Sequence, residues 1–405
     1  MVATSYEGAK LWEVHGEIQA AEHPALAEYH HPPHARSVVQ VAREYQPHVV
    51  HAVHVMKLGG AVIPALSEGG FPVVVTLCDY WALCTRHTLM KPDGQLCASG
   101  PDHARRCLVC AQATHGFAIT RTPWQDEPEL WAHADRVAAS DRHPEKRFRR
   151  DVEVLAGRTD RLREDLLAAK RIFAISSHQK DWFVQHGYPE HRIAVQPLGI
   201  ETAPLSDAKR HRQAIQDLKR PREIVFMGSL SAFKGPHLLV EAMRLIPEVP
   251  VQLVLYGAPG PDANYVSDLE QAVRQDARIT LAGVVPPDQM GSVFKGAAAL
   301  AFPTLWWAND PLVVKAALYC GVPVALHELA PLDGLVRTPD CGWRIPPGEL
   351  AAWAAWIKET ATGPIKTVPP QDAPLSQDDY AACMLAVYGE VQEEGGKSVY
   401  RRLFM

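Results

Sequence analysis

The stretch PTLWWANDPLVVKAALYCGVPVAL, residues 303–326, decides the fold of this 405-residue chain. It begins where one apolar run, AALAFPT (298–304), ends, and it closes on a second apolar run, VPVAL (322–326). Fully apolar runs of this length are typical of strands buried in parallel sheets, and the segment between them has room for a loop and a helix. The order strand, helix, strand predicts a parallel α/β sheet here.

The helix in this stretch is expected to begin at Asp310 and Pro311. Aspartate is favoured as the residue that caps a helix, and proline is favoured at the first helical position. The backbone N–H groups of Leu312 and Val313 would then have no partner within the helix. A helix amino terminus at the carboxyl edge of a parallel sheet is suited to an anion such as a diphosphate.

The same alternation of apolar runs and helical segments extends over the rest of the chain. It predicts an α/β fold with two Rossmann-like, doubly wound domains. The other expected strands are HVVHAVHV (48–55), FPVVVTL (71–77), RIFAISS (171–177), RIAVQPLGI (192–200), EIVFMGS (223–229), VQLVLYG (251–257) and RITLAG (278–283).

Shifts in composition indicate where the domains divide. The polar, Arg- and Lys-rich segment 202–221 is expected to be a linker, so the first domain would span residues 1–203 and the second 204–375. A Cys-containing insertion interrupts the first domain at about 80–165. The tail 376–405 has apolar residues at helical spacing and is expected to pack back on the first domain.

Composition and charge narrow the classes of partner. A net charge of −5 gives no chain-wide basic field for nucleic acid or an anionic membrane. No apolar stretch reaches about 18 residues, and the amino terminus lacks the pattern of a secretory signal, so we expect a cytoplasmic protein without an integral membrane segment. Eight cysteines in so long a chain do not suggest a secreted disulfide framework.

A second element, FMGSLSAFKGPHLLVEAM (226–243), places Lys234 on a glycine-bounded loop directly after an expected strand. An ammonium group there would neutralise the same diphosphate. The alternative is an ordinary solvated lysine in a loop, and neither this element nor the helix terminus is decisive alone.

Together and in this order, the motifs resemble those of the family 4 glycosyltransferases of the GT-B architecture, in which two Rossmann-like domains face each other across a cleft. The resemblance runs from about Val49 to Trp343. It rests on VVHAVHVMKLGG, PVVVTLCDYWALCTRHTLMKPDGQLC, AISSHQKDWFVQHGYPEHRIAVQPLGIE, GSLSAFKG, LVLYGAP and residues 303–326.

The resemblance implies an enzyme that moves a sugar from a nucleotide-diphosphate donor, of the UDP or GDP type, to a carbohydrate or lipid-linked acceptor with retention of configuration. Gly228 and Lys234 would serve the diphosphate. His54, Asp79 and Lys234 are the catalytic candidates. The candidate donor-binding residues are Gly228, Ser229, Lys234, Gly257, Val284, Val285, Trp306, Ala308, Asn309, Asp310, Leu312, Val313 and Ala316.

The chain departs from the family at that donor site. Two glutamates typical of the family, eight positions apart, are replaced by Ala308 and Ala316, through natural degeneration or deliberate substitution. One hydrogen bond to a charged group is worth about 1.5–3 kcal/mol, so the loss should weaken donor binding by about two orders of magnitude or more. The alternative function is therefore an impaired or inactive relative that binds donor, or acts as a scaffold for a partner glycosyltransferase.

Other departures lie nearby. Ser229 stands where the family often has arginine, Val53 stands where a histidine is expected, and the family's opening strand and glycine-rich loop have no counterpart before residue 48. His54 is the candidate substitute for the missing histidine. The alternative is that both His51 and His54 are ordinary residues at the end of a strand.

Aromatic residues and a carboxylate accompany the expected strand ends. Trp81, Trp306 and Trp307 could stack on a sugar or base, or could pack in the core. Asp79 follows a strand of the first domain, where it could contact the acceptor or leaving group, or cap a helix.

The cysteines of the insertion form a cluster, C-x12-C-x9-C-x2-C. Thiolates at this spacing could close a tetrahedral Zn²⁺ site and order the loop, although disulfides and free thiols remain alternatives. Cys78, Cys320 and Cys341 lie in or beside apolar segments and are expected to be small buried residues. The candidate zinc ligands are Cys84, Cys97, Cys107 and Cys110.

Overall fold

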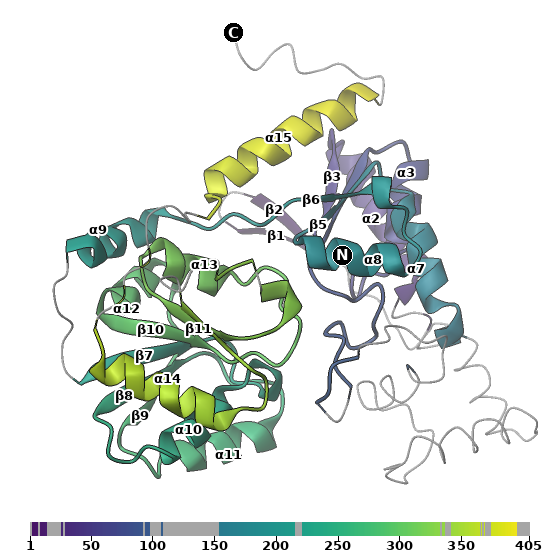
Figure 1. The fold of residues 1–405 in the computed structure, drawn as a ribbon. Helices are drawn as coiled ribbons and strands as arrows, with labels where there is room; N and C mark the ends of the chain where they lie inside the picture. The colour runs from purple at the N-terminus through teal and green to yellow at the C-terminus, as the bar shows by residue number, and fades with distance from the viewer. Residues whose placement is uncertain are drawn as a thin grey trace, which may run out of the picture. The chain divides into compact units, whose positions relative to one another are not determined.

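A computed structural model of the chain contains two compact units, which Figure 1 shows. Unit 1 comprises Met1–Gln196 and Leu385–Met405, and unit 2 comprises Pro197–Met384. The structure describes residues 2–6, 9–13, 26, 29–91, 94–97, 107, 154–214, 221–332, 334–336, 342–364, 366, 368 and 374–394.

Unit 1 is built on a parallel sheet of four strands in the order β3-β4-β5-β6. All five residues of β4 are buried, as expected for an apolar central strand. The strands are β3 (Val50–Ala52), β4 (Val73–Leu77), β5 (Arg171–Ala174) and β6 (Ile193–Val195). The helices are α2 (Pro32–Tyr45), α3 (Val62–Glu68), α7 (Arg158–Leu167) and α8 (Ser177–Gln185), and an antiparallel pair, β1 (Val2–Tyr6) and β2 (Ala9–Glu13), precedes them.

Unit 2 is built on a parallel sheet of six strands in the order β12-β11-β10-β7-β8-β9. From the middle of the sheet, β7, β8 and β9 follow one another toward one edge. The chain then returns to the middle, where β10 pairs with β7, and β11 and β12 follow toward the other edge. The strands are β7 (Arg222–Met227), β8 (Val251–Tyr256), β9 (Ile279–Gly283), β10 (Ala297–Phe302), β11 (Val324–His327) and β12 (Gly342–Ile345).

Helices cover both faces of this sheet. In Figure 1, α10 (Pro236–Arg244), α11 (Ala263–Val273) and α14 (Leu350–Thr362) lie on one face, and α12 (Met290–Gly296) and α13 (Leu312–Tyr319) lie on the other. The first three helices share a hydrophobic core with the buried strand residues. Both units are therefore parallel α/β domains, which confirms the predicted fold class.

Residues 203–214 of the segment expected to be a linker are helical. A short 3-10 turn, η3 (Ala203–Leu205), leads directly into α9 (Ser206–Ala214). Arg212 of α9 is buried, and its guanidinium donates to the backbone carbonyls of Ala297 and Lys366, at 2.8 and 3.3 Å. A basic segment that looks solvated in the sequence is thus packed onto unit 2 through one arginine.

The last described helix, α15 (Gln377–Glu394), spans the division between the units. Its second half, from Leu385 onward, belongs to unit 1. There Arg171 of β5 donates two hydrogen bonds to the Glu394 carboxylate, at 2.5 and 3.3 Å.

Candidate active site

The strand order of unit 2 places a switch point between β7 and β10, the neighbours from which the sheet grows in opposite directions. In doubly wound sheets, ligands bind beyond the carboxyl ends of the strands at such a point. The loops that follow these two strands are 228–235 and 303–311, which carry most of the predicted donor-binding residues.

Glycines let the loops of unit 2 approach one another closely. Gly228 N–H donates to the Tyr256 carbonyl at 3.0 Å, and Gly257 N–H donates to the Gly283 carbonyl at 2.7 Å. A Cβ atom at Gly257 would overlap the carbonyl oxygen of Gly228. Only glycine fits there, so the loops that follow β7 and β8 meet through backbone atoms at this point.

A second close approach joins loop 228–235 to loop 303–311. Gly235 has φ +75°, and a Cβ atom there would overlap the carbonyl oxygen of Pro303. Leu305 N–H donates to the Phe233 carbonyl at 2.8 Å. The two loops on either side of the switch point are therefore held together by backbone contacts.

Lys234 lies at this junction. Its Nζ atom is 5.0 Å from the ring centroid of Trp306 and 5.7 Å from that of Phe233, an arrangement typical of cation–π contacts. Within the described residues it has no carboxylate within ion-pair distance. Burial lowers the pKa of Lys234 from 10.5 to about 8. The buried indole N–H of Trp306 also has no hydrogen-bond partner among the described residues. Two donors side by side therefore lack an acceptor.

Two of the predicted donor-site positions offer no polar side chain. Ala308 in loop 303–311 and Ala316 on α13 are each 4% exposed. Asn309 between them is also buried. Both alanine side chains are thus covered, and neither position supplies a carboxylate that could meet a ribose or sugar hydroxyl.

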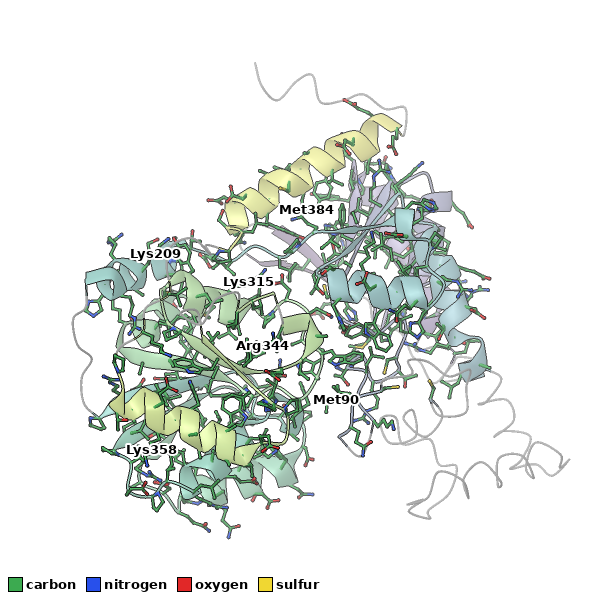
Figure 2. All side chains as sticks on the ribbon, viewed as in Figure 1. Met90, Lys209, Lys315, Arg344, Lys358 and Met384 are labelled. Atoms are coloured by element: carbon green, nitrogen blue, oxygen red, sulfur yellow. The ribbon has the colours of Figure 1, made fainter. Side chains whose placement is uncertain are left out.

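Asp310 does not cap α13, so that expectation is wrong. The helix begins at Leu312 with Pro311 as its capping residue, without a side-chain hydrogen bond. The Asp310 carboxylate instead accepts from Lys315 Nζ at 2.6 Å and from Leu198 N–H at 2.7 Å. Lys315, labelled in Figure 2, also donates to the Leu198 carbonyl at 2.7 Å. Burial raises the pKa of Asp310, and the hydrogen bond and positive charge of Lys315 oppose part of that rise.

The N–H groups of Leu312 and Val313 make no backbone hydrogen bond in the described part of the chain, which is normal for the first turn of a helix. On the other side of the switch point, Gly283 has φ +73° and Val284 after it is 67% exposed. Val285 is half-buried. Ser229 contacts Ser231 through their hydroxyl oxygens at 3.1 Å.

In unit 1, His54 and Asp79 form a pair beyond the carboxyl ends of β3 and β4. His54 Nε2 lies 2.9 Å from Asp79 Oδ2, and Met56 N–H donates to His54 Nδ1 at 3.0 Å. Since Nδ1 accepts, the proton of a neutral imidazole is on Nε2 and is donated to Asp79. Asp79 Oδ1 accepts from Trp81 N–H at 2.8 Å, so this carboxylate caps a turn as well.

Gln179 supports this pair, and the sequence reasoning missed it. Its fully buried side chain donates from Nε2 to the Asp79 carbonyl and accepts at Oε1 from Ile175 N–H, both at 2.9 Å. Ser176 caps α8 by accepting from Gln179 N–H. Ser-x-x-Gln is the sequence signature of a capping box, and it could have singled out this glutamine.

His51 has a structural place instead. Its Nδ1 lies 2.6 Å from Tyr388 Oη on α15, and its Nε2 lies 2.8 Å from Thr76 Oγ1 on β4. Burial lowers the pKa of His51. Both ring nitrogens are occupied, and Val53 beside it is half exposed, so of the two histidines only His54 reaches the Asp79 carboxylate.

Comparison with known proteins bears on unit 2 first. Residues 207–368 match the family model described as glycosyl transferases group 1. We refer to residues 207–368 as the group 1 domain. It contains the switch point, Lys234 and the two alanines.

Curated relatives share sequence over part of the chain. The D-inositol 3-phosphate glycosyltransferase of Corynebacterium urealyticum is 24% identical over 188 residues, which are 42% of this chain and 44% of that protein. The putative colanic acid biosynthesis glycosyltransferase WcaL of Escherichia coli is 23% identical over 175 residues, 42% of each chain. The chain thus spans less than half the length of these relatives.

Solved structures resemble a larger share of the chain. Sucrose-phosphate synthase of Thermosynechococcus elongatus, at 18% identity and TM-score 0.57, covers 90% of this chain and 78% of its own. A glycosyltransferase of Rickettsia africae, at 11% identity and TM-score 0.57, covers 94% and 84%. Anabaena HepE in complex with UDP and glucose, at 18% identity and TM-score 0.51, covers 91% and 82%. At these identities the likeness shows the fold.

Outside the group 1 domain, the predicted zinc site gains no support. Cys84, Cys97 and Cys107 are described, and Cys110 lies outside the described residues. Among the described residues, no group of three or more His, Cys, Asp or Glu side chains is placed to hold one metal ion. Burial raises the pKa of Cys84, which favours the thiol over the thiolate that zinc requires.

Of the three other cysteines expected to be buried, the structure confirms Cys320. Cys320 in the group 1 domain is fully buried, and burial raises its pKa to about 12. Cys78 is partly buried with a pKa of about 11, and its Sγ lies 2.9 Å from the Val53 carbonyl. Cys341 lies outside the described residues.

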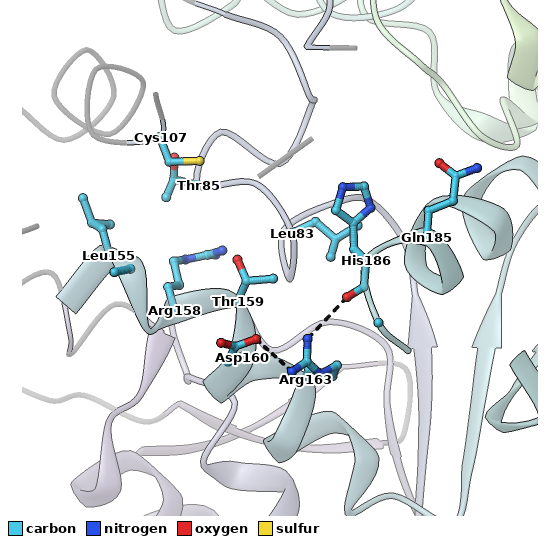
Figure 3. Close-up of a pocket in the computed structure, with 12 residues that line it drawn as sticks. Leu83, Thr85, Cys107, Leu155, Arg158, Thr159, Asp160, Arg163, Gln185 and His186 are labelled. Carbon is cyan, nitrogen blue, oxygen red and sulfur yellow. Dashed lines mark hydrogen bonds and ion pairs between the residues drawn. The ribbon is translucent and has the colours of Figure 1, made fainter. Parts of the chain in front are cut away.

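A cavity of about 270 Å³ opens in unit 1, between the beginning of α7 and the end of α8 (Figure 3). Arg163 lines it, pairing with Asp160 at 2.8 Å and donating to the His186 carbonyl at 3.4 Å. Among the described residues, Cys107 is the one predicted site residue on its wall. A helix long and apolar enough to cross a membrane does not occur in the described ranges.

Proposed function

We propose that this chain is a glycosyltransferase that binds a nucleotide-diphosphate sugar on unit 2 and passes the sugar to a carbohydrate or lipid-linked acceptor with retention of configuration. The observation that carries the proposal is the Lys234 ammonium at the switch point, half-buried and without an acidic partner among the described residues. The match of the group 1 domain supports it.

The chemistry of the site suits a diphosphate leaving group. Charge develops on the phosphate as the glycosidic bond breaks, and fixed donors in a partly dry site stabilise that charge. Lys234 supplies a cation, and the Trp306 indole, Leu312 and Val313 supply N–H groups. Gly257 lets the loop that follows β8 pack against the Gly228 carbonyl, which brings these two loops together beside the proposed site.

The acceptor side is proposed to involve the His54–Asp79 pair of unit 1. The Asp79 carboxylate holds the imidazole by accepting from Nε2, and Met56 N–H occupies Nδ1. Because no ring nitrogen is left as a free base, the pair orients an acceptor rather than taking its proton. In retaining transfer the leaving phosphate can accept that proton, so no side-chain base is required.

A second candidate function is supported by Ala308 and Ala316. Without a carboxylate at either place, the chain would hold a donor weakly and transfer slowly, as a donor-binding relative or a scaffold for an active enzyme. The relatives illustrate the first function instead. The solved structure of HepE is a complex with UDP and glucose, and the curated inositol-phosphate enzymes have a phosphorylated polyol in their name.

Titration calorimetry of the full chain with UDP, GDP and their glucose and mannose conjugates tests both candidates. We expect binding in the high micromolar to millimolar range for one of the two bases. Hydrolysis or transfer of the bound sugar would support the first function, and binding without turnover would support the second. If no nucleotide binds at millimolar concentration, the donor site is refuted for this chain.

A further inference from the structure

His327, the last residue of β11, is fully buried behind the donor loops and makes two side-chain hydrogen bonds. Trp353 Nε1 on α14 lies 2.9 Å from His327 Nε2. His327 Nδ1 lies 2.9 Å from the Thr304 carbonyl oxygen. Burying a polar side chain in the core costs free energy unless its hydrogen bonds are made. The two contacts are therefore needed to keep this histidine in the core.

The chemistry of the partners fixes the state of this imidazole. An indole N–H only donates and a carbonyl only accepts, so His327 Nε2 must carry the lone pair and Nδ1 the proton. A protonated ring would place two N–H groups against each other at Trp353. Burial lowers the pKa of His327, in agreement with a neutral ring. His327 thus accepts a hydrogen bond from the Trp353 indole and donates one to the Thr304 carbonyl.

The connection continues from Thr304 into the loop that carries Lys234. Thr304 Oγ1 donates to the Phe233 carbonyl at 3.4 Å, and Leu305 N–H donates to the same oxygen at 2.8 Å. Phe233 precedes Lys234 directly. Thr304 is itself fully buried and stands two residues before Trp306.

We propose that His327 is a positioning residue of the donor site, which fixes Thr304 and thereby holds the Lys234 ammonium over the Trp306 ring. Its significance for the donor diphosphate rests on the function proposed above. The positioning itself concerns only contacts within unit 2 and does not depend on a ligand.

The proposal assigns different roles to the two hydrogen bonds. Loss of the bond to Thr304 frees loop 303–311 from β11, so the Lys234–Trp306 contact opens and water reaches the ammonium. The pKa of Lys234 would then rise from about 8 toward its ordinary 10.5. Loss of the bond to Trp353 leaves an indole without an acceptor in the core but leaves the loop in place.

Two near-isosteric variants separate these roles. In His327→Asn, the amide nitrogen takes the place of Nδ1 and keeps the bond to Thr304. In His327→Gln, the amide oxygen reaches the place of Nε2 and keeps the bond to Trp353. Trp353→Phe is a matched control, because it removes the same indole bond from the other side. All four proteins are compared at full length, after circular dichroism has shown that they are folded.

The readout is the pKa of the Lys234 amine, measured by competitive acetylation between pH 7 and 11 with peptide mass spectrometry. We expect a value near 8 in the parent, in His327→Asn and in Trp353→Phe, and a rise of at least one pH unit in His327→Gln. If a general loss of stability caused the rise, the pKa of Lys234 would rise in Trp353→Phe as well. Equal values in the Asn and Gln variants, or a rise in Trp353→Phe, would overturn the proposal.

Calorimetry with UDP on the same proteins separates this inference from the proposed function. If both hold, His327→Gln weakens UDP binding about tenfold and His327→Asn less than twofold. If the pKa pattern is seen but UDP binds none of the proteins, the positioning role is upheld and the donor site is refuted. If UDP binds the Asn and Gln variants equally well, the significance of His327 for the donor is refuted and the donor site is upheld.

Discussion

Lys234 combines burial with a positive charge that no described carboxylate neutralises. Proteins usually pair such a group, because an ammonium loses hydration as it is covered. The lowered pKa of about 8 records that loss. Cation–π contacts with the rings of Phe233 and Trp306 compensate for part of the lost hydration. A site that keeps an unpaired cation in this way has its charge available for an anion.

Replacing Lys234 with methionine should separate binding from stability. We expect UDP binding to weaken by at least tenfold, because one charge-assisted bond to phosphate is lost. The free energy of unfolding at pH 7 should rise by about 1 kcal/mol, since a poorly hydrated charge is removed. Denaturant unfolding and calorimetry measure the two quantities.

Lys209→Met is the matched control for that variant. Lys209 Nζ also lies over an aromatic ring, 4.2 Å from the centroid of Tyr319, but away from the switch point. It should leave UDP affinity unchanged. If Lys234→Met binds UDP as the parent does, the lysine is not part of the donor site.

The same lysine sets a pH window. Its ammonium is present at pH 7 and disappears as the pH rises through about 8, so UDP affinity should fall roughly tenfold from pH 7 to pH 9. The unfolded chain keeps this lysine protonated up to about 10.5. It therefore binds more protons than the folded chain between pH 8 and 10.5, and the contribution of this group to stability increases across that interval.

Calorimetry at several pH values checks this window, with Lys234→Met expected to give a flat profile above pH 7. A parent profile that is equally flat would show that another cation carries the diphosphate.

At the scale of the helix, α13 is held by a buried ion pair rather than by a cap. Asp310 and Lys315 together bind both the N–H and the carbonyl of Leu198. Removing one member of a buried pair leaves the other charge unpaired, at a cost of about 3–5 kcal/mol. We therefore expect Asp310→Ala to destabilise the protein by this amount in denaturant unfolding.

The double variant Asp310→Leu/Lys315→Met should cost much less than Asp310→Ala, because no uncompensated charge remains. The exposed pair of Asp207 and Lys295 is the control, and Asp207→Ala should cost far less stability than Asp310→Ala because water screens this pair. If Asp310→Ala is as mild as Asp207→Ala, the buried pair does not hold the helix.

The strands of unit 2 could be predicted where apolar runs are continuous, as in β8 and β10. The beginning of α13 could not, because the carboxylate of Asp310 is bound by residues distant in sequence that local capping preferences do not reveal. The strand β12 (Gly342–Ile345) was missed, since GWRI contains a charged residue and no apolar run. α9 was taken for a linker because its buried Arg212 looks like a solvated charge in the sequence.

For the site, the sequence singled out Lys234 because a glycine-bounded loop after a strand is a local pattern. It could not reveal that Trp306 lies over this lysine, nor that His327 connects α14 to the loop, because both depend on which strands become neighbours in the sheet. Gln179 was recognisable from a local signature and was overlooked.

At the scale of the whole molecule, two α/β units are present, and the donor site that we propose on unit 2 lacks two side chains that the family resemblance implies. The two alanines predict that carboxylates placed at these positions will strengthen donor binding. In Ala308→Glu/Ala316→Glu we expect UDP-sugar affinity to increase by about tenfold or more. Without ligand the variant should be less stable by about 1–3 kcal/mol, because both positions are buried.

The neutral double variant Ala308→Gln/Ala316→Gln has the same size and serves as the control. Calorimetry, and thermal unfolding with and without UDP-glucose or GDP-mannose, give the comparison. Should the Glu and Gln pairs bind donor equally, the carboxylates have no special part in this chain.

The overlap that any side chain at Gly257 would make with the carbonyl oxygen of Gly228 has a consequence for sequence variation. In a library of random variants selected only for folded protein, position 257 should be as depleted of substitutions as the centre of the core, although it buries no side chain. Alanine would be rejected there together with bulky residues. A hydrophobicity scale would not single out Gly257, whereas a map of tolerated substitutions would rank it among the positions of the chain that tolerate the fewest.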